Sequence, residues 1–260
     1  MTDENVFQGG MNVVRRCGET VHRPAGEHTP IVHRLLTYLH RQGLQGVPVP
    51  LGFDEQGNEV LTYVEGDVHE SLTPTLRSPE LVASAGALLR RMHDASVGFA
   101  HTAQDPWMLP ARSPAEVICH GDIAPYNSAV RDGRVVGFID FDTAHPAPRL
   151  WDVAYAVYRY APLHAPNNPD SAGTPAEQAE LAATFCRAYG IASNAALLDA
   201  VVERLAALID FMRQRTGAGD ANFQQHIAEG HLALYEADIR YLGEQSGEML
   251  RTFASSSANS

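Results

Sequence analysis

The hydrophobic pattern divides the chain near residue 66. Before that point, short runs of alternating apolar and polar residues end at glycine-containing turns, which is typical of β-strands. Five strands are predicted, at Val6-Phe7, Asn12–Arg16, Thr20–Arg23, Val47–Phe53 and Glu59–Val64. One helix interrupts them, for which Thr29 is the expected cap and Pro30 the first residue. The first part should therefore be a small, β-rich unit.

Beyond residue 66 most apolar residues recur at helical spacing. One helix is predicted from Pro79 to about His93, and three more follow: one after the capping box of Thr174 and Glu177, one capped by Asn194, and one over about 222–242. Residues 161–173 are expected to form a long loop, and the Ser/Ala-rich residues 254–260 a disordered tail. The pattern predicts an α+β fold with a β-rich part, 1–66, and a mainly helical part, 67–253.

The stretch from Val117 to Asp142 is unlike an ordinary core strand. It combines apolar strand residues with a His, an Asn and several Asp residues. Asp132-Gly133 is a two-residue hairpin signal inside it. A core strand has no need of so many ionisable groups, so this stretch is the candidate site.

The predicted hairpin turn brings oxygen ligands together. If the turn centres on residues 132–133, Asn127 lies opposite Phe138, and Asp140 points to the same face as Phe138. The Cβ atoms of Asn127 and Asp140 are then at most about 7–8 Å apart, so their side-chain oxygens can converge. Such oxygens suit Mg²⁺. Asp122, which follows the strand Val117–Cys119, would face the same point.

These residues resemble the aminoglycoside phosphotransferase and choline kinase group. The segment 120–127, HGDIAPYN, has the H-x-D-x-x-x-x-N spacing of a kinase catalytic loop, with the Gly of that group after His120. Residues 139–142, IDFD, are similar to the group's metal-binding element, and Asp152 matches its next Asp. The resemblance implies a protein-kinase-like fold of two lobes, with a nucleotide-binding N-lobe, 1–66, and a catalytic, acceptor-binding C-lobe, 67–253.

The resemblance also implies roles for individual residues. Asp122 would accept the proton of, or orient, the acceptor hydroxyl, while Asn127 and Asp140 would hold Mg²⁺ on the nucleotide phosphates. The expected supporting residues are Asp142, beside the metal or the substrate, and His120 and Asp152, which would brace the loop.

The expected nucleotide site lies in the N-lobe. Residues 61–66 are similar to the group's hinge, so Tyr63 and Glu65 are expected near the base; the other interpretation is an edge strand and a linker. Gly9-Gly10 either folds over phosphates or forms a plain hairpin turn. The group usually has a strand Lys paired to a helix Glu. This chain has no Lys, and Arg23 stands near that position, either gripping phosphate or as an ordinary surface Arg.

Composition narrows the classes of partner. The net charge is −12 and all 19 basic residues are Arg, which argues against nucleic acid and favours, weakly, a cationic small molecule. No apolar run is long enough to cross a membrane, and the start lacks a secretory signal, so a cytoplasmic location is expected. The three cysteines are far apart, which predicts neither a disulfide framework nor a zinc site, and Cys119 is expected to be buried and structural. The oligomeric state is not predicted.

We therefore expect an ATP- or GTP-dependent kinase that phosphorylates a hydroxyl of an aminoglycoside, another antibiotic or an amino alcohol. The alternative is a nucleotide-binding pseudoenzyme that sequesters a ligand or partner. A metal hydrolase is less well supported, since the usual His-rich ligand spacings are missing. By resemblance, acidic side chains of the C-terminal helices would meet substrate amines; the candidates are Asp199, Glu203, Asp210, Asp220, Glu229, Glu236 and Asp238.

Overall fold

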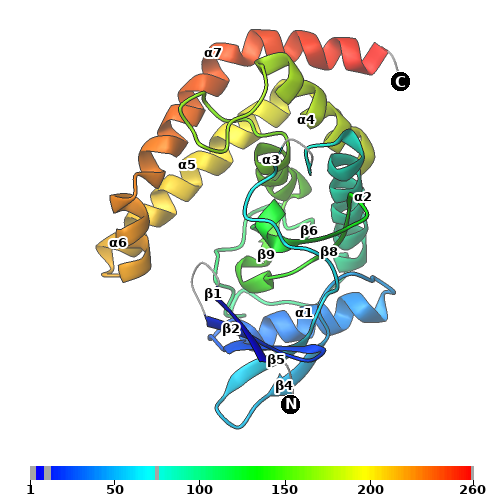
Figure 1. The fold of residues 1–260 in the computed structure, drawn as a ribbon, viewed down its shortest axis with the longest axis vertical. Coiled ribbons are helices and arrows are strands. Elements are labelled where there is room, and N and C mark those ends of the chain that lie inside the picture. The colour runs from blue at the N-terminus through cyan, green and yellow to red at the C-terminus, as the bar shows by residue number, and fades with distance from the viewer. Residues whose placement is uncertain (1–3, 9–12, 74–75, 259–260) are drawn as a thin grey trace.

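The computed structural model describes residues 4–8, 13–73 and 76–258. It has the expected two lobes, a small antiparallel sheet with one helix and a larger, mainly helical lobe (Figure 1). The sheet has the order β1-β2-β3-β5-β4 and consists of β1 (Glu4–Gln8), β2 (Val13–Cys17), β3 (Thr20–Pro24), β4 (Pro50–Phe53) and β5 (Asn58–Thr62). The predicted α+β, kinase-like fold is confirmed.

Several N-lobe boundaries differ from the prediction: β1 is longer, β5 ends at Thr62 and not at Val64, and two others have a visible cause. Strand β4 begins only at Pro50, because the carbonyls of Val47 and Pro48 lie 3.1 Å from the ring nitrogen of His40 and not in the sheet ladder. Helix α1 (Thr29–Arg41) begins one residue early, so Thr29 is not its cap. The Thr29 hydroxyl instead accepts a hydrogen bond from the Gly26 amide at 2.9 Å.

The C-lobe contains the remaining described helices. They are α2 (Pro79–Ser96), α3 (Arg149–Tyr160), α4 (Pro175–Tyr189), α5 (Ala195–Gly217), α6 (Ala221–Ala228) and α7 (His231–Ala258). The capping box of Thr174 and Glu177 and the Asn194 cap are confirmed. None of the described helices is both long and apolar enough to span a membrane.

Three C-lobe predictions were wrong. Helix α3 was not expected. The predicted helix over 222–242 is two helices, since Gly230 lies between them with a φ of 89° that interrupts the helical backbone. The predicted tail from residue 254 is helical as far as Ala258, because α7 continues through it.

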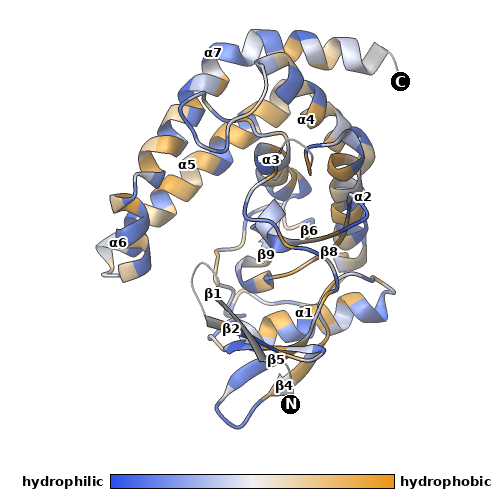
Figure 2. Ribbon diagram, in the orientation of Figure 1, coloured by the Kyte–Doolittle hydropathy of each residue, from blue (hydrophilic) through white to orange (hydrophobic). Residues whose placement is uncertain are grey.

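The core joins the helices of the C-lobe to one another. Helix α2 packs on α4, and α5 packs on α3 and α7. Apolar residues recur along these helices (Figure 2), and fully buried ones include Leu88, Tyr158, Phe185 and Leu205. Burial of each large side chain stabilises the fold by about 1.5–3 kcal/mol. This core is the rigid base on which the candidate site is built.

A hairpin connects the two lobes. It consists of β7 (Ser128–Arg131) and β8 (Arg134–Phe138). The amide of Phe138 donates to the Gly46 carbonyl at 2.8 Å, and Asp67 and Val130 exchange two backbone bonds of 2.8 Å. A side chain at Gly46 would overlap the Val136 carbonyl, so this close approach of two chains requires glycine. The hairpin is thus fixed to both the N-lobe and the linker.

Candidate functional site

The predicted hairpin turn is confirmed, but its register was wrong by one residue. Asp132 and Gly133 have the positive φ values, 52° and 69°, of a two-residue hairpin turn. Ser128, and not Asn127, pairs with Phe138, because the register shifts between Ala129 and Val130. A bulge of this kind adds one residue to one strand and cannot be deduced from the turn alone.

The loop after β6 (Val117–Cys119) surrounds Asp122 with donors. The Oδ2 atom of Asp122 accepts a hydrogen bond from Asn127 Nδ2 at 2.9 Å, and its Oδ1 atom accepts one from the Tyr126 hydroxyl at 2.8 Å. The same Asn127 nitrogen also donates to the Asp122 carbonyl at 3.0 Å. Both amide hydrogens of Asn127 therefore point at Asp122. Among the described residues, the amide oxygen of Asn127 accepts no hydrogen bond, which leaves it available as a ligand.

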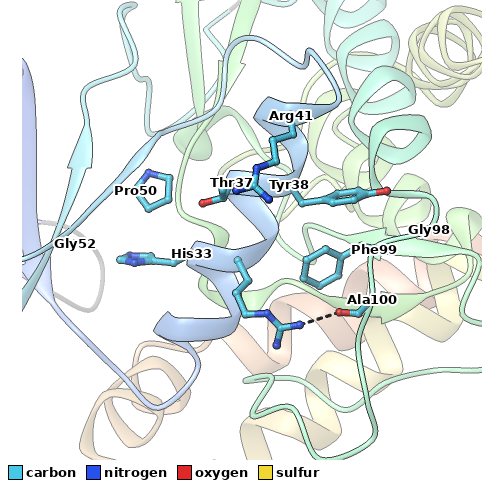
Figure 3. Close-up of a pocket in the computed structure, with 10 residues that line it drawn as sticks. His33, Thr37, Tyr38, Arg41, Pro50, Gly52, Gly98, Phe99 and Ala100 are labelled. Atoms are coloured by element: carbon cyan, nitrogen blue, oxygen red, sulfur yellow. Dashed lines mark hydrogen bonds between the residues drawn. The ribbon is translucent and has the colours of Figure 1, made fainter.

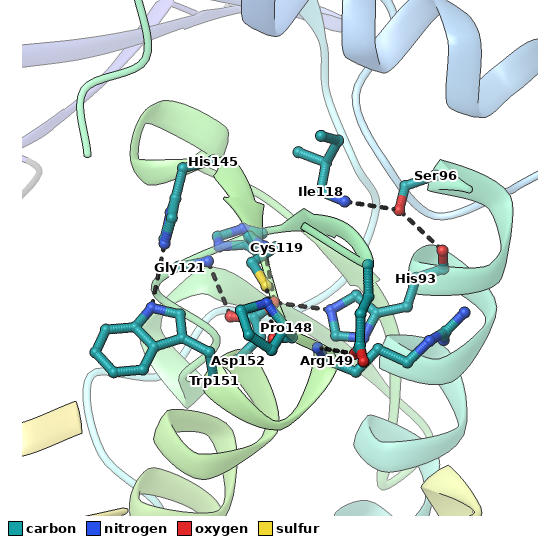
Figure 4. Close-up of polar contacts among 12 residues, drawn as sticks. His93, Ser96, Ile118, Cys119, Gly121, His145, Pro148, Arg149, Trp151 and Asp152 are labelled. Atoms are coloured by element: carbon teal, nitrogen blue, oxygen red, sulfur yellow. Dashed lines mark hydrogen bonds and ion pairs between the residues drawn. The ribbon is translucent and has the colours of Figure 1, made fainter. Parts of the chain in front are cut away.

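A buried carboxylate fixes the backbone of this loop. Asp152 on α3 is fully buried and accepts from the amides of His120 at 2.7 Å and Gly121 at 2.9 Å, and it lies 3.0 Å from His93 Nε2 (Figure 4). Burial alone would raise the pKa of Asp152, but the bond with His93 and the nearby charges lower it to about 2. Gly121 has a φ of 87°, and a side chain there would overlap the Thr143 carbonyl. The loop conformation thus depends on both residues.

His120 and Cys119 are held in the core on either side of this backbone. The His120 ring lies 2.9 Å from the Ile139 carbonyl and 4.5 Å, between centroids, from the Phe141 ring. Cys119 is fully buried, and burial raises the pKa of its thiol well above the usual value. A buried thiol that stays protonated is a poor nucleophile, which agrees with the structural role predicted for Cys119.

One guanidinium gathers three carboxylates from both lobes. Arg23 on β3 lies 2.5 Å from Glu59, 2.7 Å from Asp140 and in direct contact with Asp142. We call Arg23, Glu59, Asp140 and Asp142 the carboxylate cluster. Burial opposes the charge of Arg23, but Asp140, Asp142 and Glu59 together raise its pKa. Arg23 is 7% exposed, so the interpretation as an ordinary surface Arg was wrong.

Glu59 was missed as a site residue. Helix α1 contains no Glu, and the carboxylate beside Arg23 comes instead from β5, where Glu59 is the direct cross-strand partner of Arg23. His33 of α1 lies 2.8 Å from the other Glu59 oxygen. The sequence holds no local signal for this pair, since the two residues meet only through the β3–β5 register.

A second cluster extends from the other oxygen of Asp122. The Tyr126 hydroxyl lies 3.1 Å from the Tyr155 hydroxyl, and the Arg204 guanidinium carbon lies 4.7 Å from the Tyr155 ring centroid. Arg204 also donates to the Gly121 carbonyl at 2.7 Å. We call Asp122, Tyr126, Tyr155 and Arg204 the tyrosine–arginine cluster. Burial, and then Asp122, raise the pKa of both tyrosines, so their hydroxyls stay protonated.

The structure describes the two linker residues that are expected to bind the nucleotide, Tyr63 and Glu65. No described contact joins either of them to one of the two clusters. Tyr63 lies under Arg16, with 3.6 Å between the guanidinium carbon and the ring centroid. Glu65 is exposed and lies 3.7 Å from Arg131. Gly9 and Gly10 lie outside the described residues, so their expected contact with phosphates stays a prediction.

The acidic residues expected to meet an amine are mostly engaged elsewhere. Asp238 is fully buried and accepts hydrogen bonds from the Ala165 amide, in the loop after α3, and from the Tyr158 hydroxyl of α3. Asp220 caps α6. The others with described partners lie near basic groups of the helix surface: Glu203 near Arg112, Asp210 and Glu236 near Arg213, and Glu229 near His231.

A cavity of about 530 Å³ meets the carboxylate cluster at His33, which lies 2.8 Å from Glu59 (Figure 3). Its lining comes from α1, β4 and the segment after α2, with Tyr38, Arg41 and Phe99 among the residues. None of the predicted site residues lines it. It is therefore not the candidate site, which consists of the two clusters around residues 120–142.

The chain resembles known proteins in sequence and in fold. The model of the phosphotransferase enzyme family matches residues 13–108 and 99–208. One curated relative, a trifolitoxin immunity protein of Rhizobium leguminosarum bv. trifolii, is 35% identical over 171 residues, or 63% of this chain and 64% of that protein. The match thus spans less than two thirds of the relative's length.

Solved structures of low sequence identity share the fold. An aminoglycoside 2'-phosphotransferase-IIIa in its GDP complex superposes with a TM-score of 0.65 at 15% identity, covering 92% of this chain and 93% of that one. A choline/ethanolamine kinase family protein from Mesorhizobium loti gives 0.64 at 16% identity, with 97% and 92% covered. An amicoumacin kinase in complex with AMP-PNP, Ca2+ and Ami gives 0.61 at 14% identity, with 87% and 88% covered.

Proposed function

The chain belongs to the phosphotransferase enzyme family, and from that premise we propose that it transfers the γ-phosphoryl group of ATP or GTP to a hydroxyl of a small-molecule acceptor. In this proposal residues 1–66 hold the nucleotide and residues 67–253 hold the acceptor. Tyr63, Glu65 and the Gly9-Gly10 turn contact the nucleotide. The observation that carries the proposal is the bonding of Asp122. Two donors fix its carboxylate, and it is only partly buried, beside ligands for a metal.

The residues present fit a divalent cation. The Asp140 side chain is 47% exposed, and the carboxylate cluster has three carboxylates for one guanidinium. With the free amide oxygen of Asn127, Asp140 offers the oxygen ligands that Mg²⁺ prefers. A bound Mg²⁺ would neutralise charge on the nucleotide phosphates. Arg23, already buried against Asp140, is placed to provide the same neutralisation from β3.

Asp122 would act on the acceptor hydroxyl. An acceptor oxygen forms a bond to the γ-phosphorus, the bond from that phosphorus to the β,γ-bridging oxygen breaks, and the nucleoside diphosphate leaves. The hydroxyl proton passes to the Asp122 carboxylate, which Asn127 and Tyr126 hold in position. Asp152 and His120 keep the loop backbone fixed, and Asp142 keeps Arg23 in place. Such positioning is most of what phosphoryl transfer requires from a protein.

A binding protein without turnover is the second candidate. The feature that favours it is the engagement of Arg23 by three carboxylates, which leaves that guanidinium less free for phosphate. The curated relative is named an immunity protein, and protection could come either from phosphorylating a toxic molecule or from holding it. The two candidates differ in whether the nucleotide is consumed.

Asp122→Asn tests the proposal against this alternative. We expect turnover to fall about 10²–10⁴-fold with the Kd for ATP nearly unchanged, because Asp122 has no part in nucleotide binding here. Asp132→Asn is the matched control, since Asp132 lies exposed in the hairpin turn and Asn tolerates its positive φ. Metal-dependent ATP consumption in the wild type that equals that of Asp122→Asn would contradict the proposed function.

A further inference from the structure

We propose that the acceptor carries an anionic group, such as a carboxylate, which pairs with Arg204 while the hydroxyl meets Asp122, and that polycationic acceptors are disfavoured. This inference rests on the proposed function. It departs from the cationic acceptor expected from the net charge, because it follows the charges near Asp122 and not their sum over the chain.

Arg204 is a buried cation whose described contacts are a carbonyl and two aromatic rings. Its residue is 6% exposed, and its Nε is buried with no hydrogen-bond partner. Within the described part of the chain, Arg204 forms no ion pair. Its one hydrogen bond goes to the carbonyl of Gly121, the residue before Asp122. Removing a guanidinium from water is costly unless a partner compensates it, and the aromatic faces of Tyr155 and Trp151, 4.7 and 5.0 Å away, compensate only part.

The remaining groups near Asp122 do not form a site for a cation. Tyrosine rings could surround an ammonium group, but a resident cation already lies among them: the Arg159 guanidinium carbon is 5.3 Å from the Tyr126 centroid. Burial raises the pKa of Tyr235 on α7; Arg159 and Arg204 lower it, while Asp122 and Asp238 raise it. An incoming cation would therefore meet two guanidiniums.

Most of the acidic residues that could attract amines have partners; of the seven candidates, Asp199 alone has none within the described residues, and it is exposed on α5. Each of Glu203, Asp210, Asp220, Glu229, Glu236 and Asp238 has a described partner away from Asp122. Arg159 lies 3.1 Å from Asp170, so the carboxylate of Asp170 is also paired with a guanidinium. Of the carboxylates that contact these tyrosines, Asp238 is fully buried and already bonded to Tyr158, Ala165 and Asn168, and Asp122 is needed for the hydroxyl.

Three acceptors that differ mainly in charge, assayed at about pH 6.5, provide the test: N-acetylserine is an anion, N-acetylserinamide is neutral and serinamide is mainly a cation. Initial rates are measured with saturating Mg-ATP, and the same comparison is made on every scaffold that supports turnover in a screen of hydroxy acids, sugars, amino alcohols and aminoglycosides. We expect kcat/KM to be about ten-fold higher or more for the anion than for the cation, the size of one charged hydrogen bond.

Arg204→Gln separates this role from mere support of the loop. We expect it to lower kcat/KM for the anion about ten-fold, through KM, and to leave the neutral acceptor and the KM for ATP within about two-fold. Equal losses for all three charges would mean that Arg204 only holds Gly121 and would overturn the inference. Arg204→Lys keeps the charge and should keep the preference for the anion, and it replaces Arg204→Gln as the deciding variant if the latter does not fold.

The remaining outcomes are also decisive. Turnover confined to amino alcohols or aminoglycosides overturns the inference and leaves the proposed function standing. Binding of ATP with no acceptor of any charge class phosphorylated contradicts the inference as well. If Mg-ATP does not bind at all, by calorimetry, the proposed function itself is contradicted.

Discussion

The two clusters on the segment 120–142 differ in the sign of their excess charge. In the carboxylate cluster, one guanidinium faces three carboxylates, and the excess is negative. In the tyrosine–arginine cluster, a guanidinium without an ion pair stands beside one carboxylate and two protonated tyrosines. The difference teaches that net charge, −12 for the chain, says little about a site. Under the two proposals above, one face of the loop would hold a metal cation and the other an anionic ligand.

Removing Arg23 should break the carboxylate cluster and have the largest effect. Arg23→Ala leaves Glu59 buried beside Asp142 without its cation, and breaking a buried ion pair costs about 3–5 kcal/mol. Urea unfolding would measure the loss, and calorimetry with ATP the accompanying loss of affinity. Arg131→Ala is the control, because that side chain is 58% exposed and should change stability by less than about 0.5 kcal/mol. Equal losses in both variants would mean that the buried pairing contributes nothing.

Asp152→Asn tests the support that both clusters share. The pKa of Asp152, about 2 in the folded protein, lies below the ordinary value of about 3.9, so its carboxylate stabilises the fold above pH 4 and this contribution disappears as the pH falls towards 2. We expect about 2–3 kcal/mol less stability at pH 7 and a smaller decline between pH 5 and pH 2 than in the wild type. An unchanged pH profile would contradict the assignment.

Acidification should weaken the hydrogen bond between Trp151 and His145, and the ring of Trp151 lies against Arg204. His145 Nδ1 lies 2.8 Å from the Thr143 carbonyl, which makes it the donor, so Nε2 accepts from the Trp151 indole at 3.1 Å and the ring is neutral. Burial lowers the pKa of His145. The unfolded chain therefore binds the extra proton below about pH 6.5, and stability falls by at most about 1.4 kcal/mol per pH unit there. His145→Gln should reduce the decline measured by urea unfolding between pH 7 and pH 5.5.

The smallest effect is expected for Tyr155→Phe, which tests the contribution of the tyrosine–arginine cluster. The change removes the hydroxyl beside Tyr126 but leaves the bond from Tyr126 to Asp122. Loss of one hydrogen bond predicts about 0.5–1.5 kcal/mol of stability, with a fall in kcat and an unchanged KM for ATP. Tyr38→Phe, which removes a hydroxyl bonded to the Val97 carbonyl far from the loop, is the control. A fall in kcat of the same size in both variants would contradict a role for Tyr155.

Features that depend on neighbouring residues were predicted from the sequence. The hairpin turn at Asp132 and Gly133, the Asn194 cap and the capping box at Thr174 each involve residues a few positions apart, so local chemistry decides them. The two lobes and the loop with Asp122 followed from the resemblance. Helix α3 was missed because Asp152 was interpreted only as part of a motif, and because the residues that follow are nearly all buried, so that no polar face marks the helix.

Features that depend on packing between distant elements were not predicted. Glu59 reaches Arg23 through the β3–β5 register, and Arg204 reaches Gly121 because α5 packs against α3. The bulge in β7–β8 moved Asn127 by one position relative to Phe138. None of these follows from spacing along the chain, because each is decided by which surfaces the core brings together.

The backbone hydrogen bonds of the lobe-connecting hairpin make the motion between the two lobes measurable. The amides of Val130 and Phe138 are bonded to Asp67 and Gly46, on the linker and the N-lobe, so they become accessible to solvent deuterium when the linker or the N-lobe moves away from the hairpin. Native-state hydrogen exchange at these two amides would report the frequency of that opening. The exchange rates of these two amides would thus measure how often the small lobe moves away from the large one.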